Sequence, residues 1–298
     1  MEIIPAYNIN IDKWDDCVSA NGGLIYATTT YLNVMTDNWS GLVINDYETV
    51  MPLPWRRKWG IRYLYTPSFM QQLGWIGKSR IDLNVLNQLL DGFIQYGDYL
   101  FNSTNHFYLS TETLTPKCNC ILDLSKDYQQ IQLNYSKELI GYLKKAKKNG
   151  LIVTNTDVSF AVDAYKKLYS DRFSSTDDLD YQHFIQLCNL LEKQGKAFAR
   201  KVIDENEKRL AIGLFLKDNN RIYNLMPSTY PEGRKLCAMH FLLDTIFHEN
   251  AGKQLIFDFE GSDHPGIKQF YQLFGSTEES YMHWHFNHLP RIIKIIKK

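Results

Sequence analysis

Hydrophobic positions recur at spacings of three and four residues in several long stretches, which is the pattern of helices that bury one face. In the stretch that starts at Asp82, for example, Val85 and Leu89 fall on one side. Ser136 is a favourable N-cap for a second helix, and Gly150 is a favourable residue just past its end. The pattern predicts helices over residues 29–35, 82–99, 137–149, 157–170, 180–194, 234–250 and 265–273.

Shorter runs of β-branched and aromatic residues lie between these helices and are bounded by turn-forming residues, as expected for strands. Asn45 and Asp46 favour a turn between two such runs. The pattern predicts strands over residues 24–28, 40–44, 48–53, 60–65, 106–110, 120–124, 151–154, 197–204, 209–217, 220–226, 254–260 and 281–288.

The two halves of the chain repeat one order of elements, which is hairpin, strand, helix and strand. A short sequence echo accompanies the repeat, because Pro67-Ser68 in the first half corresponds to Pro227-Ser228 in the second. No stretch rich in proline, glycine and serine separates the halves, so we expect them to pack closely. We predict two α/β domains, residues 1–130 and 131–298, with the boundary between Leu124 and Ser136.

The composition excludes several classes of protein. The chain has 298 residues, of which 44% are hydrophobic and 14% aromatic, so collagen-like, disordered and small disulfide-stapled classes are ruled out. The 33 basic residues balance the 33 acidic ones, and this net charge of zero argues against a strongly basic RNA-binding module. The motifs of P-loop NTPases, α/β-hydrolases and zincins are absent from the sequence.

The cysteines and the chain ends bear on the compartment. Five cysteines without framework spacing predict reduced thiols in a cytoplasmic protein. We expect no secretory signal, and no window of about 18 apolar residues predicts a transmembrane segment. The basic, apolar run 289–298 either makes a peripheral contact with a membrane surface or docks on the body of the protein.

Motifs in the second half carry a family resemblance. The strand motif Asp258-Phe259-Glu260-Gly261 is followed by a helix with the pattern Gly-Ile-x-x-Phe, and then by Phe274-Gly275. Upstream, residues 121–124 are Ile-Leu-Asp-Leu. Residues 144–150 form the basic end of a predicted helix, and Gly150 is the last of them. Together these motifs resemble the FemAB family, a tandem branch of the GNAT acyltransferase superfamily. The resemblance implies an α/β fold of two tandem GNAT-like domains, each a mixed, mostly antiparallel sheet flanked by helices.

The same resemblance implies an activity. FemAB-type enzymes transfer amino acids from aminoacyl-tRNA to peptidoglycan precursors, so we expect an N-acyltransferase or aminoacyltransferase that acts on an amine. The acceptor would be a small molecule or a cell-envelope precursor. The donor would be acyl-CoA or aminoacyl-tRNA, neither of them permanently bound. The long helical arm that many of these enzymes carry has no counterpart here, which weakens the case for tRNA. The alternative is a GNAT-like domain that has lost catalysis and binds a ligand or partner.

The GNAT layout places a donor pyrophosphate at the helix that follows the fourth strand, where free N–H groups favour an anion. In this chain that place is Gly233, Arg234 and Lys235, the predicted cofactor-binding residues. The usual Arg/Gln-x-x-Gly-x-Gly/Ala loop is absent there, and residues 71–76 come closest to it in the first half. The alternative interpretation is a turn glycine followed by a basic turn on a surface helix.

Asp258 and His264 are the predicted catalytic residues, since a general base is needed to take the amine's proton. The alternatives are that Asp258 shapes the end of its strand and that His264 only opens a helix. Tyr223, Asn224 and Ser228 are the predicted substrate-binding residues, because they lie near the carboxyl ends of the central strands of the second half.

Two other polar clusters have simpler explanations. His283 and His285 share one face of a strand, but no carboxylate or cysteine lies nearby in sequence, so we predict no metal site. The lysines of residues 144–148 stand at a helix C-terminus, where the helix dipole favours cations; a phosphate or tRNA contact is the functional alternative.

Overall fold

The computed structural model describes residues 1–107, 114–172, 176–261, 263 and 265–289. The chain divides into unit 1, residues Met1–Lys117 and Ser280–Lys298, and unit 2, residues Cys118–Glu279. These units differ from the predicted ranges 1–130 and 131–298 at two places. Strand β7 (Leu114–Asp123) pairs through its second half with a strand of unit 2, and β14 (Thr277–Asn287) pairs through its second half with a strand of unit 1.

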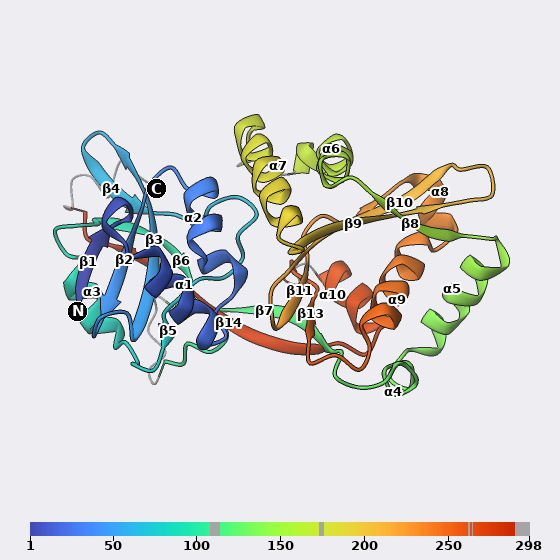
Figure 1. Ribbon diagram of the computed structural model, residues 1–298, viewed down its shortest axis with the longest axis horizontal. Helices are drawn as coiled ribbons and strands as arrows, with labels where there is room; N and C mark the ends of the chain where they lie inside the picture. The colour runs from blue at the N-terminus through green and yellow to red at the C-terminus, as the bar shows by residue number, and fades with distance from the viewer. Residues whose placement is uncertain (108–113, 173–175, 262, 264, 290–298) are drawn as a thin grey trace. The chain divides into compact units, whose positions relative to one another are not determined.

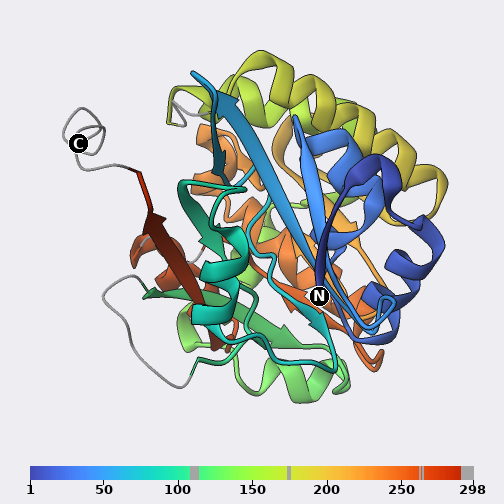
Figure 2. The same ribbon diagram turned by 90° about the vertical axis from the view of Figure 1, so that its left-hand side faces the viewer.

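Unit 1 contains a sheet in the order β1, β2, β3, β4, β6, with the second half of β14 at the end. Only the β4–β6 pair is parallel among these neighbours, and the first strands lie side by side in blue in Figure 2. Its elements are β1 (Glu2–Pro5), α1 (Ile11–Ala20), α2 (Thr29–Met35), β2 (Trp39–Ile44), β3 (Thr49–Lys58), β4 (Ile61–Leu64), β5 (Ile76–Gly77), α3 (Leu83–Leu90) and β6 (Tyr96–Leu100).

Unit 2 contains a sheet in the order β7, β13, β11, β10, β9, β8, in which only β11 and β13 run parallel. Helices α6 and α7 lie on one side of this sheet, and α5, α9 and α10 lie on the other (Figure 1). Its further elements are α4 (Tyr128–Gln132), α5 (Lys137–Lys148), β8 (Ile152–Thr156), α6 (Val158–Tyr169), α7 (Asp178–Lys193), β9 (Ala197–Ile203), β10 (Arg209–Lys217), β11 (Arg221–Asn224), β12 (Ser228–Thr229), α8 (Pro231–Lys235), α9 (Ala238–Asn250), β13 (Ile256–Asp258) and α10 (Pro265–Gln272).

The core of unit 2 is largely aromatic. The rings of Phe247 and Phe257 meet edge to face at 4.8 Å, and Phe257 and Phe259 do the same at 5.0 Å. Phe215 on β10 and Phe274 after α10 complete the group, and all five side chains are fully buried. Helix α9 is thereby fixed against the sheet, and its N-terminus points toward the pocket described below.

Capping residues fix several helices as predicted. The Ser136 hydroxyl accepts a hydrogen bond from the Leu139 N–H group at the start of α5, and Gly150 follows the helix with a φ of 64°. The Asp82 carboxylate accepts hydrogen bonds from the N–H groups of Asn84 and Val85 at the start of α3. Among the helices of the described residues, none is long and apolar enough to cross a membrane.

Three predicted elements are wrong in their type or extent. The predicted helix 82–99 ends at Leu90, and the strand β6 begins at Tyr96. The predicted helix 234–250 is two helices, because Cys237 adopts a left-handed backbone conformation with a φ of 59° between α8 and α9. Residues 24–28 contain a 3-10 turn rather than a strand. The predicted strand 106–110 falls mostly on residues outside the described part of the chain.

Candidate functional site

The candidate site begins where β11 ends. The end of β10 pairs with β11, and the start of β10 pairs with β12. The register shifts by one residue between the two pairings, so the chain between β11 and β12 forms a bulge. The N–H groups of Leu225 and Met226 both donate to the Leu214 carbonyl, at 3.2 and 3.4 Å. Pairing between β11 and β13 also stops here, at Tyr223 opposite Asp258. The two parallel strands therefore lose contact at their carboxyl ends, a usual position for a ligand site in a sheet of this kind.

The three predicted substrate-binding residues occupy both faces of the sheet. Asn224 lies opposite Phe215, so its side chain is on the face that packs against α9. Tyr223 and Ser228 lie opposite Leu216 and Ile212, on the other face. The Tyr223 hydroxyl donates to the Asp218 carboxylate. The structure thus brings Tyr223 and Ser228 to one face and Asn224 to the other.

Asn224 and Ser228 are buried polar residues without partners. Asn224 is 1% exposed, and neither its amide nitrogen nor its amide oxygen has a hydrogen-bond partner in the part of the chain that the structure describes. The Ser228 hydroxyl is likewise unpartnered there, at 0% exposure. A buried amide without partners costs free energy, but neither Asn224 nor Ser228 is among the residues that line the pocket described below.

A pocket of about 400 Å³ lies within unit 2 beside this bulge. Pro227 and Thr229 line it from the strand side, and the first residues of α9 line it from below the sheet. Its volume is in the range of sites that hold small molecules. The larger apolar and aromatic side chains of its wall come from α6, α9 and α10, and they are Tyr165, Tyr169, Met239, Ile267, Phe270 and Tyr271.

The predicted cofactor-binding residues lie at this pocket. A Cβ atom on Gly233 would stand 1.9 Å from the Leu210 carbonyl oxygen, so glycine is required for α8 to pack on β10. Gly233 and Arg234 line the pocket, and Arg234 is exposed. Lys235, also exposed, lines an adjoining pocket of about 470 Å³.

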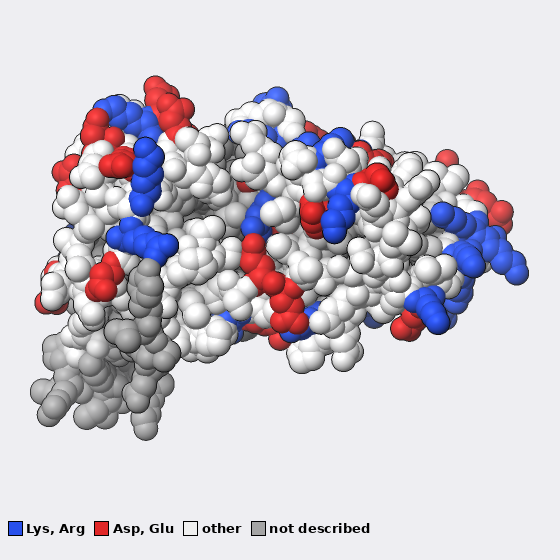
Figure 3. Space-filling model, turned by 90° about the horizontal axis from the view of Figure 1, so that it is seen from below, with Lys and Arg blue, Asp and Glu red and all other residues white. Residues whose placement is uncertain are grey.

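The adjoining pocket carries most of the charge. Lys145 from α5 joins Arg234 and Lys235 in its wall, against the single carboxylate of Glu138, which accepts a hydrogen bond from the Tyr142 hydroxyl. Basic side chains gather at the end of unit 2 that carries α5 (Figure 3). The excess of positive charge favours an anionic group in this pocket.

Cys237 and the start of α9 separate the two pockets and line both. No side chain of the described residues caps α9, and the first N–H groups of a helix have no partner within the helix. Burial raises the pKa of the Cys237 thiol, and the nearby Lys145 opposes this rise. The free N–H groups and the helix dipole favour negative charge at this point.

His240, in the first turn of α9, also lines both pockets. Its ring packs against Tyr142 at 4.8 Å and Phe270 at 4.7 Å between ring centres. Burial lowers the pKa of His240 to about 4, against an opposing effect of Glu138, so the imidazole is neutral at pH 7. Its buried Nδ1 atom has no partner among the described residues.

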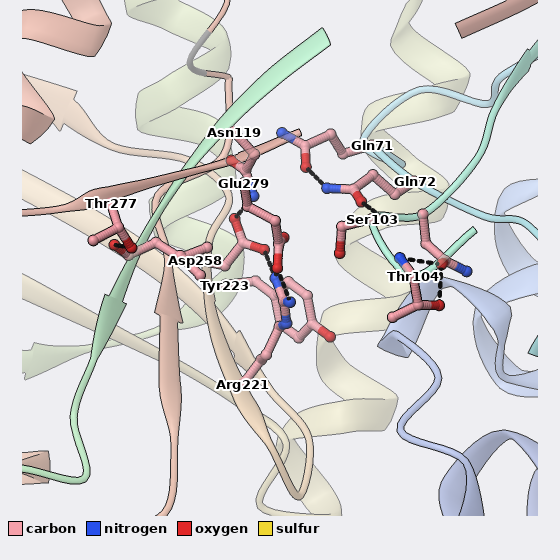
Figure 4. A network of polar contacts seen from close by, with 12 residues as sticks. Gln71, Gln72, Ser103, Thr104, Asn119, Arg221, Tyr223, Asp258, Thr277 and Glu279 are labelled. Atoms are coloured by element: carbon pink, nitrogen blue, oxygen red, sulfur yellow. Dashed lines mark hydrogen bonds and ion pairs between the residues drawn. The ribbon is translucent and has the colours of Figure 1, made fainter. Parts of the chain in front are cut away.

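Asp258 belongs to a buried network away from the pocket wall (Figure 4). One carboxylate oxygen accepts hydrogen bonds from the Asn119 amide at 2.8 Å and the Glu260 N–H group at 3.1 Å, and the other pairs with Arg221 at 2.7 Å. Arg221 also pairs with both oxygens of Glu279, at 3.0 and 2.7 Å. Burial raises the pKa of Asp258 against the opposing effect of Arg221.

The remaining polar candidates stand elsewhere. His264 lies outside the described residues. In unit 1, His283 and His285 each lie 3.0 Å from one oxygen of Asp98, a carboxylate that neighbours them across strands rather than in sequence. No group of three or more possible metal ligands is found among the residues that the structure describes.

The loop of residues 71–76 in unit 1 already uses its backbone groups internally. The Gly74 N–H group donates to the Tyr99 hydroxyl, and the Trp75 N–H group donates to the Asn105 side chain, both at 3.0 Å. A Cβ atom on Gly74 would stand 1.9 Å from the same Asn105 oxygen. These donors are therefore occupied, which leaves them unavailable to a phosphate.

Sequence reasoning missed Cys237, His240 and the two tyrosines of α6. The histidine and the cysteine fall within a helical pattern that was predicted to be continuous, so their place at a helix start was hidden. The available signal was the Pro-x-Gly-x-x segment of residues 231–235, which favours a separate short helix.

Comparisons with known proteins bear on the fold. No family model and no curated protein matches the sequence. Among solved structures, FemX is similar over 100% of both chains, with a TM-score of 0.66 and 13% identity. The tandem GNAT protein from the clavulanic acid biosynthesis pathway is similar over 97% of this chain and 99% of its own, with a TM-score of 0.55 and 11% identity. L-PGS from Bacillus licheniformis is similar over 96% and 94%, with a TM-score of 0.55 and 10% identity.

The fold is that of the FemAB-like tandem GNAT proteins. The predicted fold class and the family resemblance are thereby confirmed at the level of fold. In this fold, the pocket at the start of α9 lies beside the segment that follows β11.

Proposed function

We propose that the protein transfers an acyl or aminoacyl group from a carrier to an amine acceptor, and that the pocket of unit 2 holds the donor. The observation that carries this proposal is the meeting of an apolar pocket and a basic pocket at the uncapped N-terminus of α9. A donor in which an acyl group is joined to a phosphate-bearing carrier has two matching parts. The acyl group suits the apolar pocket, and the phosphates suit the basic pocket.

The residues take separate roles in this proposal. Lys145, Arg234 and Lys235 bind the phosphates of the carrier. The free N–H groups of α9 face the donor carbonyl and stabilise the oxyanion that forms on it. A substrate-binding role for Asn224 stays a prediction, because Asn224 is buried and is not among the residues that line the two pockets.

The chemistry needs little covalent participation by the protein. The amine nitrogen bonds to the carbonyl carbon, and the bond from that carbon to the carrier sulfur or oxygen breaks. The proton that the amine loses ends on the released thiol or hydroxyl. Holding the two reactants in line supplies much of the rate enhancement.

We assign Asp258 a positioning role. Both of its oxygens accept hydrogen bonds, and the Glu260 N–H group that it holds belongs to the left-handed turn at the end of β13. A general-base role for His264, and acceptor-binding roles for Tyr223 and Ser228, stay predictions.

Two donor classes fit the basic pocket, acyl-CoA and aminoacyl-tRNA. The structure of the similar tandem GNAT protein from the clavulanic acid biosynthesis pathway is one without AcCoA, and CoA is the donor that we test first here. A cell-envelope precursor as the amine acceptor follows from the FemAB resemblance alone.

Calorimetric titration of the whole protein with acetyl-CoA tests the donor site. We expect saturable binding that weakens about tenfold in Arg234→Ala, because a charge-assisted contact to phosphate contributes roughly 1.5 kcal/mol. Arg209→Ala is the matched control, since Arg209 is an exposed arginine of unit 2 that lines neither pocket. Equal affinities in the two variants would contradict the assignment of the basic pocket.

The second candidate function is a domain that binds such a donor without transferring its acyl group. It is favoured by one observation, that the predicted base Asp258 is 1% exposed and committed to Arg221 and Asn119. Release of free CoA in the presence of a panel of primary amines distinguishes the two. Transfer predicts amine-dependent release, whereas the binding domain predicts donor binding with no release.

A further inference from the structure

We infer that the acyl pocket selects an uncharged, apolar acyl group and excludes acyl groups that carry an ammonium. The inference rests on the proposed function, because it names the substrate class of the same site. It makes acyl chains of several carbons the substrates, in preference to both acetyl and α-aminoacyl groups.

The wall of the pocket carries the first argument. Among the described residues that line it, none is Asp, Glu or Lys, and Arg234 is the only one with a permanent charge. His240 is neutral at pH 7 because burial lowers its pKa to about 4. The larger remaining side chains are aromatic or aliphatic, so the pocket offers apolar contact and no counter-ion for an ammonium.

The position of the carbonyl carries the second argument. An α-ammonium lies two bonds from the carbonyl carbon, which the proposed function places at the N-terminus of α9. The helix dipole makes that end positive, and Arg234 lies in the same wall. A like charge would therefore be desolvated without a partner, which is strongly unfavourable.

The nearby carboxylates do not compensate, because none of them is among the described residues that line the acyl pocket; Glu260, whose charge acts on Tyr271, lines neither pocket. Glu138 lines only the adjoining basic pocket, where it accepts a hydrogen bond from Tyr142 and faces three cations, Lys145, Arg234 and Lys235. The carrier phosphates occupy this side. The acyl chain therefore extends in the other direction, toward Tyr165, Ile267 and Tyr271.

A ladder of acyl-CoA ligands tests the inference by calorimetry on the wild-type protein, without any need for the acceptor. Each added methylene from acetyl to octanoyl should tighten binding about fourfold until the pocket is filled, which is the burial of one CH₂ group, ~0.8 kcal/mol, converted to affinity. Affinities that do not change along the ladder would overturn the inference.

A matched pair of ligands isolates the charge. Heptanoyl-CoA and 6-aminohexanoyl-CoA have chains of equal length that end in a methyl and an ammonium group. We expect the heptanoyl ligand to bind at least about tenfold more tightly. Equal binding, or a preference for the ammonium, would overturn the inference and indicate that the aromatic rings accept a cation.

A negative charge placed in the pocket wall should weaken this preference. Ile267 lies in the first turn of α10 and is 41% exposed, so Ile267→Asp is compatible with the fold and with the helix dipole. The ratio of the heptanoyl to the aminohexanoyl affinity should fall about tenfold. Ile140→Asp is the control, because Ile140 is equally exposed on α5 and lines neither pocket.

The outcomes separate the two proposals. If no CoA ligand binds, including acetyl-CoA, the CoA-dependent form of the proposed function fails and the inference fails with it. If acetyl-CoA binds but chain length and terminal charge have no effect, the proposed function stands and only the inference is overturned. The pocket would then hold the pantetheine arm.

Discussion

His240 occupies the first turn of α9 with its ring against Tyr142 and Phe270. The sequence offers no reason to single it out, because one histidine within an apolar helical stretch is usually a core residue. The role of His240 depends on the helix break at Cys237, because the break places His240 near the start of α9 and not in the middle of a longer helix. A neutral imidazole then lines both pockets.

The lowered pKa of His240 predicts a pH dependence of folding stability. The folded state holds the neutral ring down to about pH 4, whereas an unfolded histidine protonates near 6.5, so unfolding takes up a proton between these values. This contribution is complete above pH 6.5 and is lost as the pH falls toward 4. Between pH 7 and pH 4, the wild type should lose about 3 kcal/mol more unfolding free energy than His240→Gln. Urea unfolding at several pH values measures this, and parallel curves for the two proteins would contradict it.

Asp258 shows what a motif can and cannot predict. The sequence places the Asp-Phe-x-Gly segment correctly at the end of a buried strand, and Asp258 is at the end of β13. The partners of its carboxylate come from residues 119, 221 and 260, of which only the last is near in sequence. A carboxylate that looks available for catalysis in the sequence is therefore already hydrogen-bonded through both oxygens.

At the scale of elements, the helices with strong capping residues were predictable and the helix break was not. Ser136 and Asp82 mark the starts of α5 and α3 through hydrogen bonds that any chain with those residues would favour. The left-handed conformation of Cys237 has no such local signal, because cysteine carries a Cβ atom and gains nothing from a positive φ.

Gly233 is the point at which α8 meets the sheet, and its replacement tests this packing. A Cβ atom would stand 1.9 Å from the Leu210 oxygen and 2.6 Å from the Leu210 carbonyl carbon. Gly233→Ala should therefore lower the free energy of unfolding by about 1–3 kcal/mol. Gly141 on α5 is the control, because its Cβ would meet nothing within 4 Å, and Gly141→Ala should raise stability by about 0.5–1 kcal/mol. Thermal unfolding of both variants measures these changes. Similar changes in melting temperature for the two variants would show that α8 does not pack tightly on β10 at Gly233.

At the scale of the whole molecule, the repeated order of elements predicted two units, but the ranges of those units depend on pairings that are distant in sequence. Residues 118–130 looked like the end of the first domain because a helix start follows them. In the structure, Asp258 of β13 pairs with Ile121 of β7, 137 residues earlier in the chain. Such long-range register leaves no mark in local hydrophobic patterning.

This pairing predicts how fragments of the chain behave. Phe257 of β13 is 0% exposed, and Leu122 and Leu124 belong to the same core, so removal of β7 would turn a buried strand into an open apolar edge. We therefore expect a fragment of residues 114–279 to unfold cooperatively and to remain monomeric. A fragment of residues 131–279, which differs only by the loss of β7 and α4, should aggregate or lack a cooperative transition. Circular dichroism melts and gel filtration of the two fragments measure this. If the shorter fragment melted cooperatively at the same temperature, β7 would be dispensable, and the boundary near residue 130 would describe the folding unit better than the one at residue 118.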